Sequence, residues 1–147
     1  MEKINKIAIG CDHAGFPYKD SIRQMLEDEG IEVIDFGTNN PDSVDYPDFV
    51  HPVAERVEKG EVDFGIILCG SGNGANMTAN KHQGVRSALC WSLEITELAR
   101  QHNNANVLSL PVRFLSEPQA LHYAKVFIST EFEGGRHQRR IDKIPCG

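Results

Sequence analysis

A cysteine followed by a glycine-rich loop is the feature of this sequence with the clearest chemical potential. Cys69 ends a continuous apolar run that begins at Phe64, and the loop GSGNG follows at positions 70–74. Three glycines within five residues allow backbone N–H groups to turn towards an anion. A helix starting after the loop would add partial positive charge. These dipoles should favour the thiolate of Cys69, and the alternative is a tight turn with an inert buried thiol.

The spacing in this loop excludes three familiar anion-binding motifs. No Gly-Lys-Ser/Thr follows, so the loop is not the P-loop of nucleotide triphosphatases. Ala75 stands where a dinucleotide-binding loop needs its third glycine, and also where a cysteine phosphatase needs arginine. What remains is a thiol beside a group of N–H donors.

Three further groups of polar residues could contribute chemistry. Asp12 and His13 follow an apolar run, so they should lie at the same edge of a parallel sheet as Cys69, although a helix cap would also explain them. His102 ends an apolar helical face, where a core histidine is the common alternative. Arg136 and Arg140 are four residues apart and could share a phosphate, although a solvated basic tail is the alternative.

These residues need a scaffold, and the alternation of apolar runs with helical patterns predicts one. It is typical of βαβ units and a mostly parallel sheet. We expect strands over residues 4–10, 31–36, 64–69, 85–90 and 106–110. We expect helices over residues 18–30, 48–59, 75–80, 95–102 and 134–143. A further helix should begin at residue 116. A polar loop covers residues 37–47, and one domain spans residues 1–147.

Composition limits the function classes. The net charge of −6 argues against a general nucleic-acid binder. No apolar stretch approaches the roughly 20 residues that span a bilayer, and the N-terminus has no signal-peptide pattern. The four cysteines form no CxxC pair and have no zinc-ligand spacing, which favours reduced thiols in the cytoplasm and no metal site.

Taken together, the motifs resemble those of the ribose-5-phosphate isomerase B family, which also includes galactose-6-phosphate isomerase subunits. The resemblance covers nearly the whole chain. The motifs occur in the family's order: GCDHAG at 10–15, DYP at 45–47, CGSGNG at 69–74, ANK at 79–81, RQHN at 100–103 and EGGRH at 133–137.

The resemblance implies a single-domain α/β fold, with a Rossmann-like five-stranded parallel sheet between helices on both faces. It implies interconversion of ribose 5-phosphate and ribulose 5-phosphate in the pentose phosphate pathway. It also implies a homodimer, or a dimer of dimers, with sites at the subunit interface and no cofactor. The expected partner is a small sugar phosphate, not a nucleic acid or a membrane.

The resemblance also implies roles for individual residues. Cys69 matches the catalytic base and His102 the group that opens the furanose ring. In the mechanism that these residues permit, Ser71 Oγ would hold the oxyanion together with the backbone N–H groups of the loop. Substrate-binding positions are Asp12, His13, Tyr46, Gly70, Gly72, Asn73, Gly74, Asn103, Arg113, Arg136 and Arg140.

Two other functions fit parts of this pattern. One is isomerisation of a six-carbon sugar phosphate, such as allose 6-phosphate or galactose 6-phosphate. The presence of Cys69, His102 and the arginines on one chain favours a self-sufficient homo-oligomer over a subunit pair. The other is a sugar-phosphate sensor without catalysis, which gives no reason for a thiol at the start of the loop.

Overall fold

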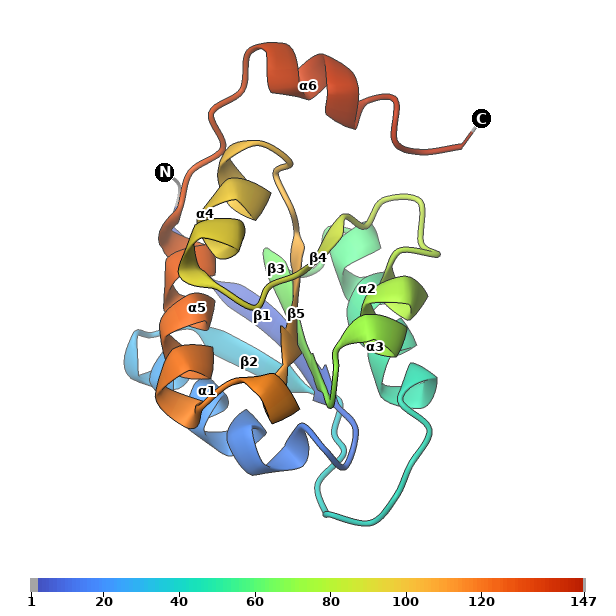
Figure 1. Ribbon diagram of the computed structural model, residues 1–147, viewed down its shortest axis with the longest axis vertical. Coiled ribbons are helices and arrows are strands. Elements are labelled where there is room, and N and C mark those ends of the chain that lie inside the picture. The colour runs from blue at the N-terminus through green and yellow to red at the C-terminus, as the bar shows by residue number, and fades with distance from the viewer. Residues whose placement is uncertain (1–2, 147) are drawn as a thin grey trace.

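The fold is a five-stranded sheet in the order β2-β1-β3-β5-β4, and every pair of neighbouring strands is parallel (Figure 1). The computed structural model describes residues 3–146. The strands are β1 (Lys6–Cys11), β2 (Glu32–Asp35), β3 (Phe64–Cys69), β4 (Ser87–Leu89) and β5 (Val107–Pro111). Because all strands run in one direction, the residues that follow β1, β3 and β5 meet at the same edge of the sheet.

Helices cover both faces of the sheet, as the sequence predicts. One face carries α1 (Phe16–Asp28), α4 (Leu93–Gln101) and α5 (Glu117–Ser129), and the other carries α2 (Pro47–Glu58) and α3 (Asn73–Ala79). A 3-10 helix, η1 (Val112–Phe114), follows β5, and α6 (Arg136–Ile141) crosses one end of the molecule (Figure 1). The expected three-layer α/β architecture is confirmed.

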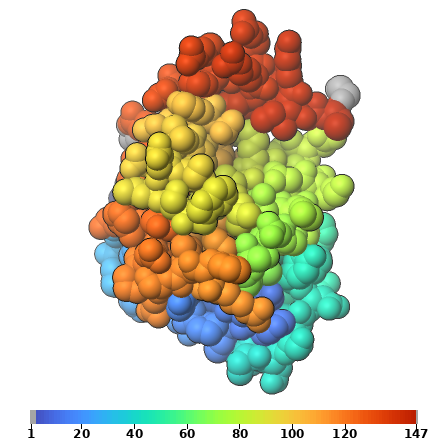
Figure 2. Space-filling view, in the orientation of Figure 1, coloured from blue at the N-terminus to red at the C-terminus, as the bar shows by residue number. Residues whose placement is uncertain are grey.

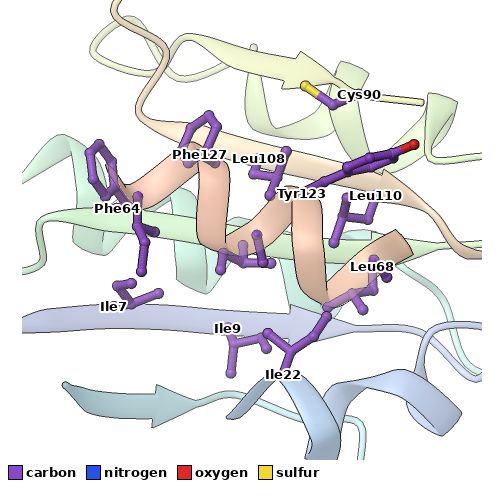
Figure 3. Close-up of a cluster of buried hydrophobic side chains, with 14 of the residues drawn as sticks. Ile7, Ile9, Ile22, Phe64, Leu68, Cys90, Leu108, Leu110, Tyr123 and Phe127 are labelled. Atoms are coloured by element: carbon purple, nitrogen blue, oxygen red, sulfur yellow. The ribbon is translucent and has the colours of Figure 1, made fainter. Parts of the chain in front are cut away.

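Two apolar clusters hold the layers together, one on each face of the sheet. The larger packs Phe127 and Tyr123 of α5 against side chains of β1, β3 and β5 (Figure 3). All six residues of β3 are buried, which is why this strand reads as a continuous apolar run. Its predicted bounds, 64–69, are those observed.

Other boundaries differ from the prediction for local reasons. The strand expected over 85–90 shortens to β4, because it lies at the edge of the sheet and pairs only with β5. The helix expected from residue 75 starts at Asn73, because Gly72 adopts a left-handed φ of 78° and ends the turn early. The start at Ser116 is confirmed by a capping box with Gln119.

The C-terminal segment lies against the residues that precede β4. The space-filling view shows it as a red band beside the yellow-green chain near residue 80 (Figure 2). The backbone N–H of Cys146 donates to Gln83 Oε1 at 3.1 Å. All four cysteines are free thiols, and none of the helices within residues 3–146 is long and apolar enough to cross a membrane.

Candidate active site

The loop after β3 is fixed by contacts that need glycine. Gly72 has φ 78°, and its carbonyl accepts a hydrogen bond from Ser109 Oγ at 3.0 Å. A side chain at Gly72 would also collide with Leu89. The chain can therefore turn from Cys69 into α3 within three residues. This places Cys69 at the carboxyl edge of the sheet with 8% of its surface exposed.

Asp12 is the immediate partner of the Cys69 thiol. It follows β1, which pairs directly with β3, so Cys11 lies opposite Leu68. The Cys69 thiol donates to Asp12 Oδ2 at 3.3 Å. The other carboxylate oxygen accepts from the N–H groups of Ala14 at 2.9 Å and Gly15 at 3.1 Å. The carboxylate is therefore held with one oxygen directed at the sulfur.

This environment raises the pKa of Cys69 above its ordinary value. Burial is the main cause, and the charge and hydrogen bond of Asp12 act in the same direction. The N–H groups of Gly72 and Gly70 lower the pKa, which is the contribution expected from the loop. The expectation that the loop favours the thiolate is therefore confirmed for its N–H groups, but burial and Asp12 outweigh them, and the Cys69 pKa lies above its ordinary value.

Three more of the predicted residues lie at this edge. Tyr46 packs against Gly74 so closely that any side chain there would overlap its ring. The Arg113 side chain lies over Gly70, and the Arg113 N–H donates to the Gly70 carbonyl at 3.1 Å. Ser71 is exposed, and its Oγ accepts from the Asn73 N–H at 3.3 Å. The edge thus presents a thiol, a carboxylate, a phenol and a guanidinium.

The loop over residues 37–46 reaches this edge because a fully buried lysine holds it. Lys19 Nζ lies 2.9 Å from Asp35 Oδ2 and donates to the Thr38 carbonyl at 2.8 Å and to Asn39 Oδ1 at 2.5 Å. Further along the loop, the Val44 N–H donates to His13 Nδ1 at 3.2 Å. The loop therefore orients His13, which the sequence places in the site.

An open pocket of about 390 Å³ adjoins the glycine loop, and its walls are largely apolar. It is lined by Ser71, Asn73, Leu89, Trp91, Pro111 and Phe114. Two of these apolar side chains are unusually exposed, Trp91 at 57% and Phe114 at 74%. A larger hollow of about 610 Å³ between α1 and α5 has no cysteine, histidine or basic residue in its lining, so we do not assign the chemistry to it.

The remaining predicted residues form a second group. His102 caps the end of α4, and its side chain is 42% exposed, so it is not a core histidine. Its Nε2 lies 3.7 Å from Glu133 Oε1, and its ring stacks on His137 at 4.3 Å between centroids. Asn103 follows it and is exposed. Arg136 and Arg140, also exposed, lie in α6, four residues apart.

These two groups lie at opposite ends of the sheet. Cys69 pairs with Pro111 at the end of β5, whereas His102 precedes Val107 at its start. The length of β5 alone separates the two ends by about 13 Å, at about 3.3 Å per residue. Figure 1 shows α6 at the end away from the junction of β5 and η1. One chain therefore does not bring Cys69 and His102 together.

One set of side chains within residues 3–146 has the composition of a metal site. Ligand atoms of His102, Glu133 and His137 lie within 4.8 Å of one another. Burial and the neighbouring His102 lower the pKa of His137, and the positive charges of Arg136 and Arg140 add to this effect, so they oppose a cation here. Sequence reasoning missed two residues of these sites, Glu133 and Lys19. The motif EGGRH contains Glu133 and could have indicated it. No local pattern indicates that a lysine such as Lys19 is buried.

The comparisons with known proteins agree on one family. The model of the family described as Ribose/Galactose Isomerase matches residues 7–144. Ribose-5-phosphate isomerase B of Escherichia coli is 42% identical over 96% of this chain and 95% of its own.

Solved structures give the same result. A ribose 5-phosphate isomerase of Thermotoga maritima has a TM-score of 0.93 and 46% identity, over 98% of this chain and 99% of its own. Ribose-5-phosphate isomerase B of Mycoplasma genitalium, solved with bound ribulose-5-phosphate, has a TM-score of 0.92 and 46% identity, over 95% of this chain and 93% of its own.

Proposed function

This chain belongs to the ribose/galactose isomerase family, and we propose that it is a ribose-5-phosphate isomerase that interconverts D-ribose 5-phosphate and D-ribulose 5-phosphate. The observation that carries the proposal is Cys69, a buried thiol that begins a loop of N–H donors. The reaction moves one proton between C2 and C1 of the open-chain sugar through an enediolate. It needs a base, an oxyanion site and a phosphate anchor, and it requires no cofactor.

Cys69 is the base in this proposal. As the thiolate it takes the C2 proton of open-chain ribose 5-phosphate, and it returns that proton to C1. The N–H groups of Gly70 and Gly72 already lower its pKa, and they oppose the effect of Asp12. The same loop, with Ser71 Oγ, holds the enediolate oxygen. Losing one such donor typically costs about 3–4 kcal/mol in the barrier.

His102 opens the furanose ring, and it does so in the site of a second copy of the chain. The separation of Cys69 from His102 within one chain supports a homodimer in which each site takes groups from both protomers. The exposed Trp91 and Phe114 beside the glycine loop offer apolar surface for that contact.

The second copy also supplies the groups that anchor the substrate. Asn103 contacts a sugar hydroxyl, while Arg136 and Arg140 bind the phosphate with His13 and Arg113. Tyr46 and Asp12 complete the pocket around the sugar. Binding energy from the phosphate then positions the reacting carbons. A catalytic thiol must stay reduced, which favours the cytoplasm, where this reaction serves the pentose phosphate pathway.

The test compares ribose 5-phosphate with allose 6-phosphate, using the wild type and Cys69→Ala. We expect turnover of the five-carbon substrate, and its loss by about a thousandfold or more in the variant, because general base catalysis is removed. Binding of ribose 5-phosphate, followed by calorimetry, should survive the substitution. Preferred turnover of allose 6-phosphate would identify a six-carbon isomerase instead. Binding without exchange of the C2 hydrogen would identify a sensor.

A further inference from the structure

Two side chains from segments remote in sequence lie beside the ring of His102. Glu133 Oε1 lies 3.7 Å from its Nε2, an ion-pair distance, and 3.6 Å from His137 Nε2. The His137 ring lies nearly parallel to it, with 15° between the planes. The carboxylate therefore faces both imidazoles, and the stacked ring limits rotation of His102.

Hydrogen bonds join the backbone segments that carry His102 and Glu133, so the position of the Glu133 carboxylate is fixed by the fold. The Glu133 N–H donates to the Gln101 carbonyl at 3.0 Å, one residue before His102. Arg100, which is 5% exposed, donates to the Ala105 carbonyl at 2.6 Å and to the Thr130 carbonyl at 3.2 Å. These bonds join the end of α4 to the segment that follows α5.

We propose that Glu133 is a positioning residue for ring opening, which holds the His102 imidazole with its Nε2 proton towards the carboxylate and leaves Nδ1 to exchange a proton with the sugar. This inference rests on the proposed function, in which His102 opens the furanose. A carboxylate beside one ring nitrogen fixes the tautomer and raises the basicity of the other nitrogen.

The neighbouring histidine completes this arrangement. Partial burial, the adjacent His102 and Arg136 lower the pKa of His137, while Glu133 opposes them. His137 therefore stays neutral more readily than an isolated histidine does. A neutral ring can stack on His102 without adding a second positive charge beside the proton that His102 must exchange.

The chemistry of the two substrates gives a test that separates ring opening from proton transfer. Ribose 5-phosphate exists mainly as a furanose and must be opened. Ribulose 5-phosphate is acyclic, because its C5 oxygen carries the phosphate and cannot close on the C2 carbonyl. Exchange of its C1 hydrogen with deuterium in D₂O therefore reports Cys69 without ring opening.

The experiment measures both rates in the wild type and in Glu133→Gln. We expect kcat for ribose 5-phosphate to fall about tenfold or more, as for loss of part of an acid–base contribution, with deuterium exchange of ribulose 5-phosphate nearly unchanged. Glu133→Asp should recover part of the lost rate, and Glu55→Gln, which removes an exposed charge on α2, should change neither rate. An equal fall in both rates, or no fall in either, would overturn the positioning role.

A second measurement tests the inference without turnover. In the free protein, ¹⁵N NMR of the neutral His102 ring should show the proton on Nε2, and Glu133→Ala should yield a mixture of tautomers. An unchanged tautomer would contradict the proposal. Absence of wild-type turnover would instead refute the proposed isomerase function. The NMR result would still test whether Glu133 fixes the tautomer of His102.

Discussion

Replacing Lys19 with methionine should destabilise the fold strongly, because this lysine is fully buried. Its side chain has 0% of its surface exposed, and its ammonium group is shared by Asp35, the Thr38 carbonyl and Asn39. Methionine matches the length of the aliphatic stem but removes the charge and all these hydrogen bonds. The Thr38 carbonyl and Asn39 Oδ1 then lose their lysine donor.

The size of the effect follows from what remains around Asp35. Breaking a buried ion pair by removing one partner typically costs about 3–5 kcal/mol. Asp35 keeps 22% of its side chain exposed and still accepts from the Gly37 N–H at 2.8 Å, so its charge remains partly solvated and hydrogen-bonded. We therefore expect a loss near the lower limit, about 3 kcal/mol in the free energy of unfolding.

Urea unfolding, followed by circular dichroism, measures this loss. With a slope of about 1–3 kcal/mol per molar urea, the midpoint should fall by about 1–3 M. Lys6→Met is the matched control, because Lys6 lies 3.1 Å from Glu32 but the two side chains are 42% and 64% exposed. The control should lose less than about 1 kcal/mol. If Lys19→Met also lost less than that, the reasoning from burial would be refuted.

Two further predictions concern the glycine loop and its thiol. Gly74→Ala should displace the Tyr46 ring, which we expect to lower the free energy of unfolding by about 1–3 kcal/mol and to lower kcat/KM. Unchanged stability and unchanged kcat/KM would show that the Tyr46 ring moves freely. Asp12→Asn should increase the rate at which iodoacetamide alkylates Cys69 near neutral pH, because the carboxylate that raises the Cys69 pKa is gone. Mass spectrometry can follow the alkylation of Cys69, with the exposed Cys146 as the reference thiol. An alkylation rate equal to that of the wild type would contradict the influence of Asp12 on the Cys69 pKa.

Much of the fold can be predicted from the sequence where local patterns are strong. The apolar run 64–69 marks a strand buried on both faces, and Ser116 with Gln119 marks a helix start. The extent of β4 could not be predicted, because an apolar run does not indicate that a strand lies at the edge of the sheet. Burial of Lys19 depends on Asp35 and on a loop that folds back over α1, which no local pattern encodes.

The candidate site was predictable in its residues and less so in its geometry. The motifs name Cys69 and Asp12, but their contact joins residues 57 positions apart and depends on the pairing of β1 with β3. Burial of the thiol, together with that contact, raises the Cys69 pKa and outweighs the N–H groups of the loop. Strand direction, in contrast, already implies that His102 and Cys69 lie at opposite ends of the sheet.

The most direct test of the whole account mixes two inactive variants, Cys69→Ala and His102→Ala. If each site takes Cys69 from one protomer and His102 from its partner, the mixed dimer regains one intact site. Unfolding and refolding an equal mixture should then restore about a quarter of wild-type activity on ribose 5-phosphate, since half of the dimers are mixed and each has one intact site of two. No recovery, with mixed dimers verified by native mass spectrometry, would contradict a site shared between two copies of this chain.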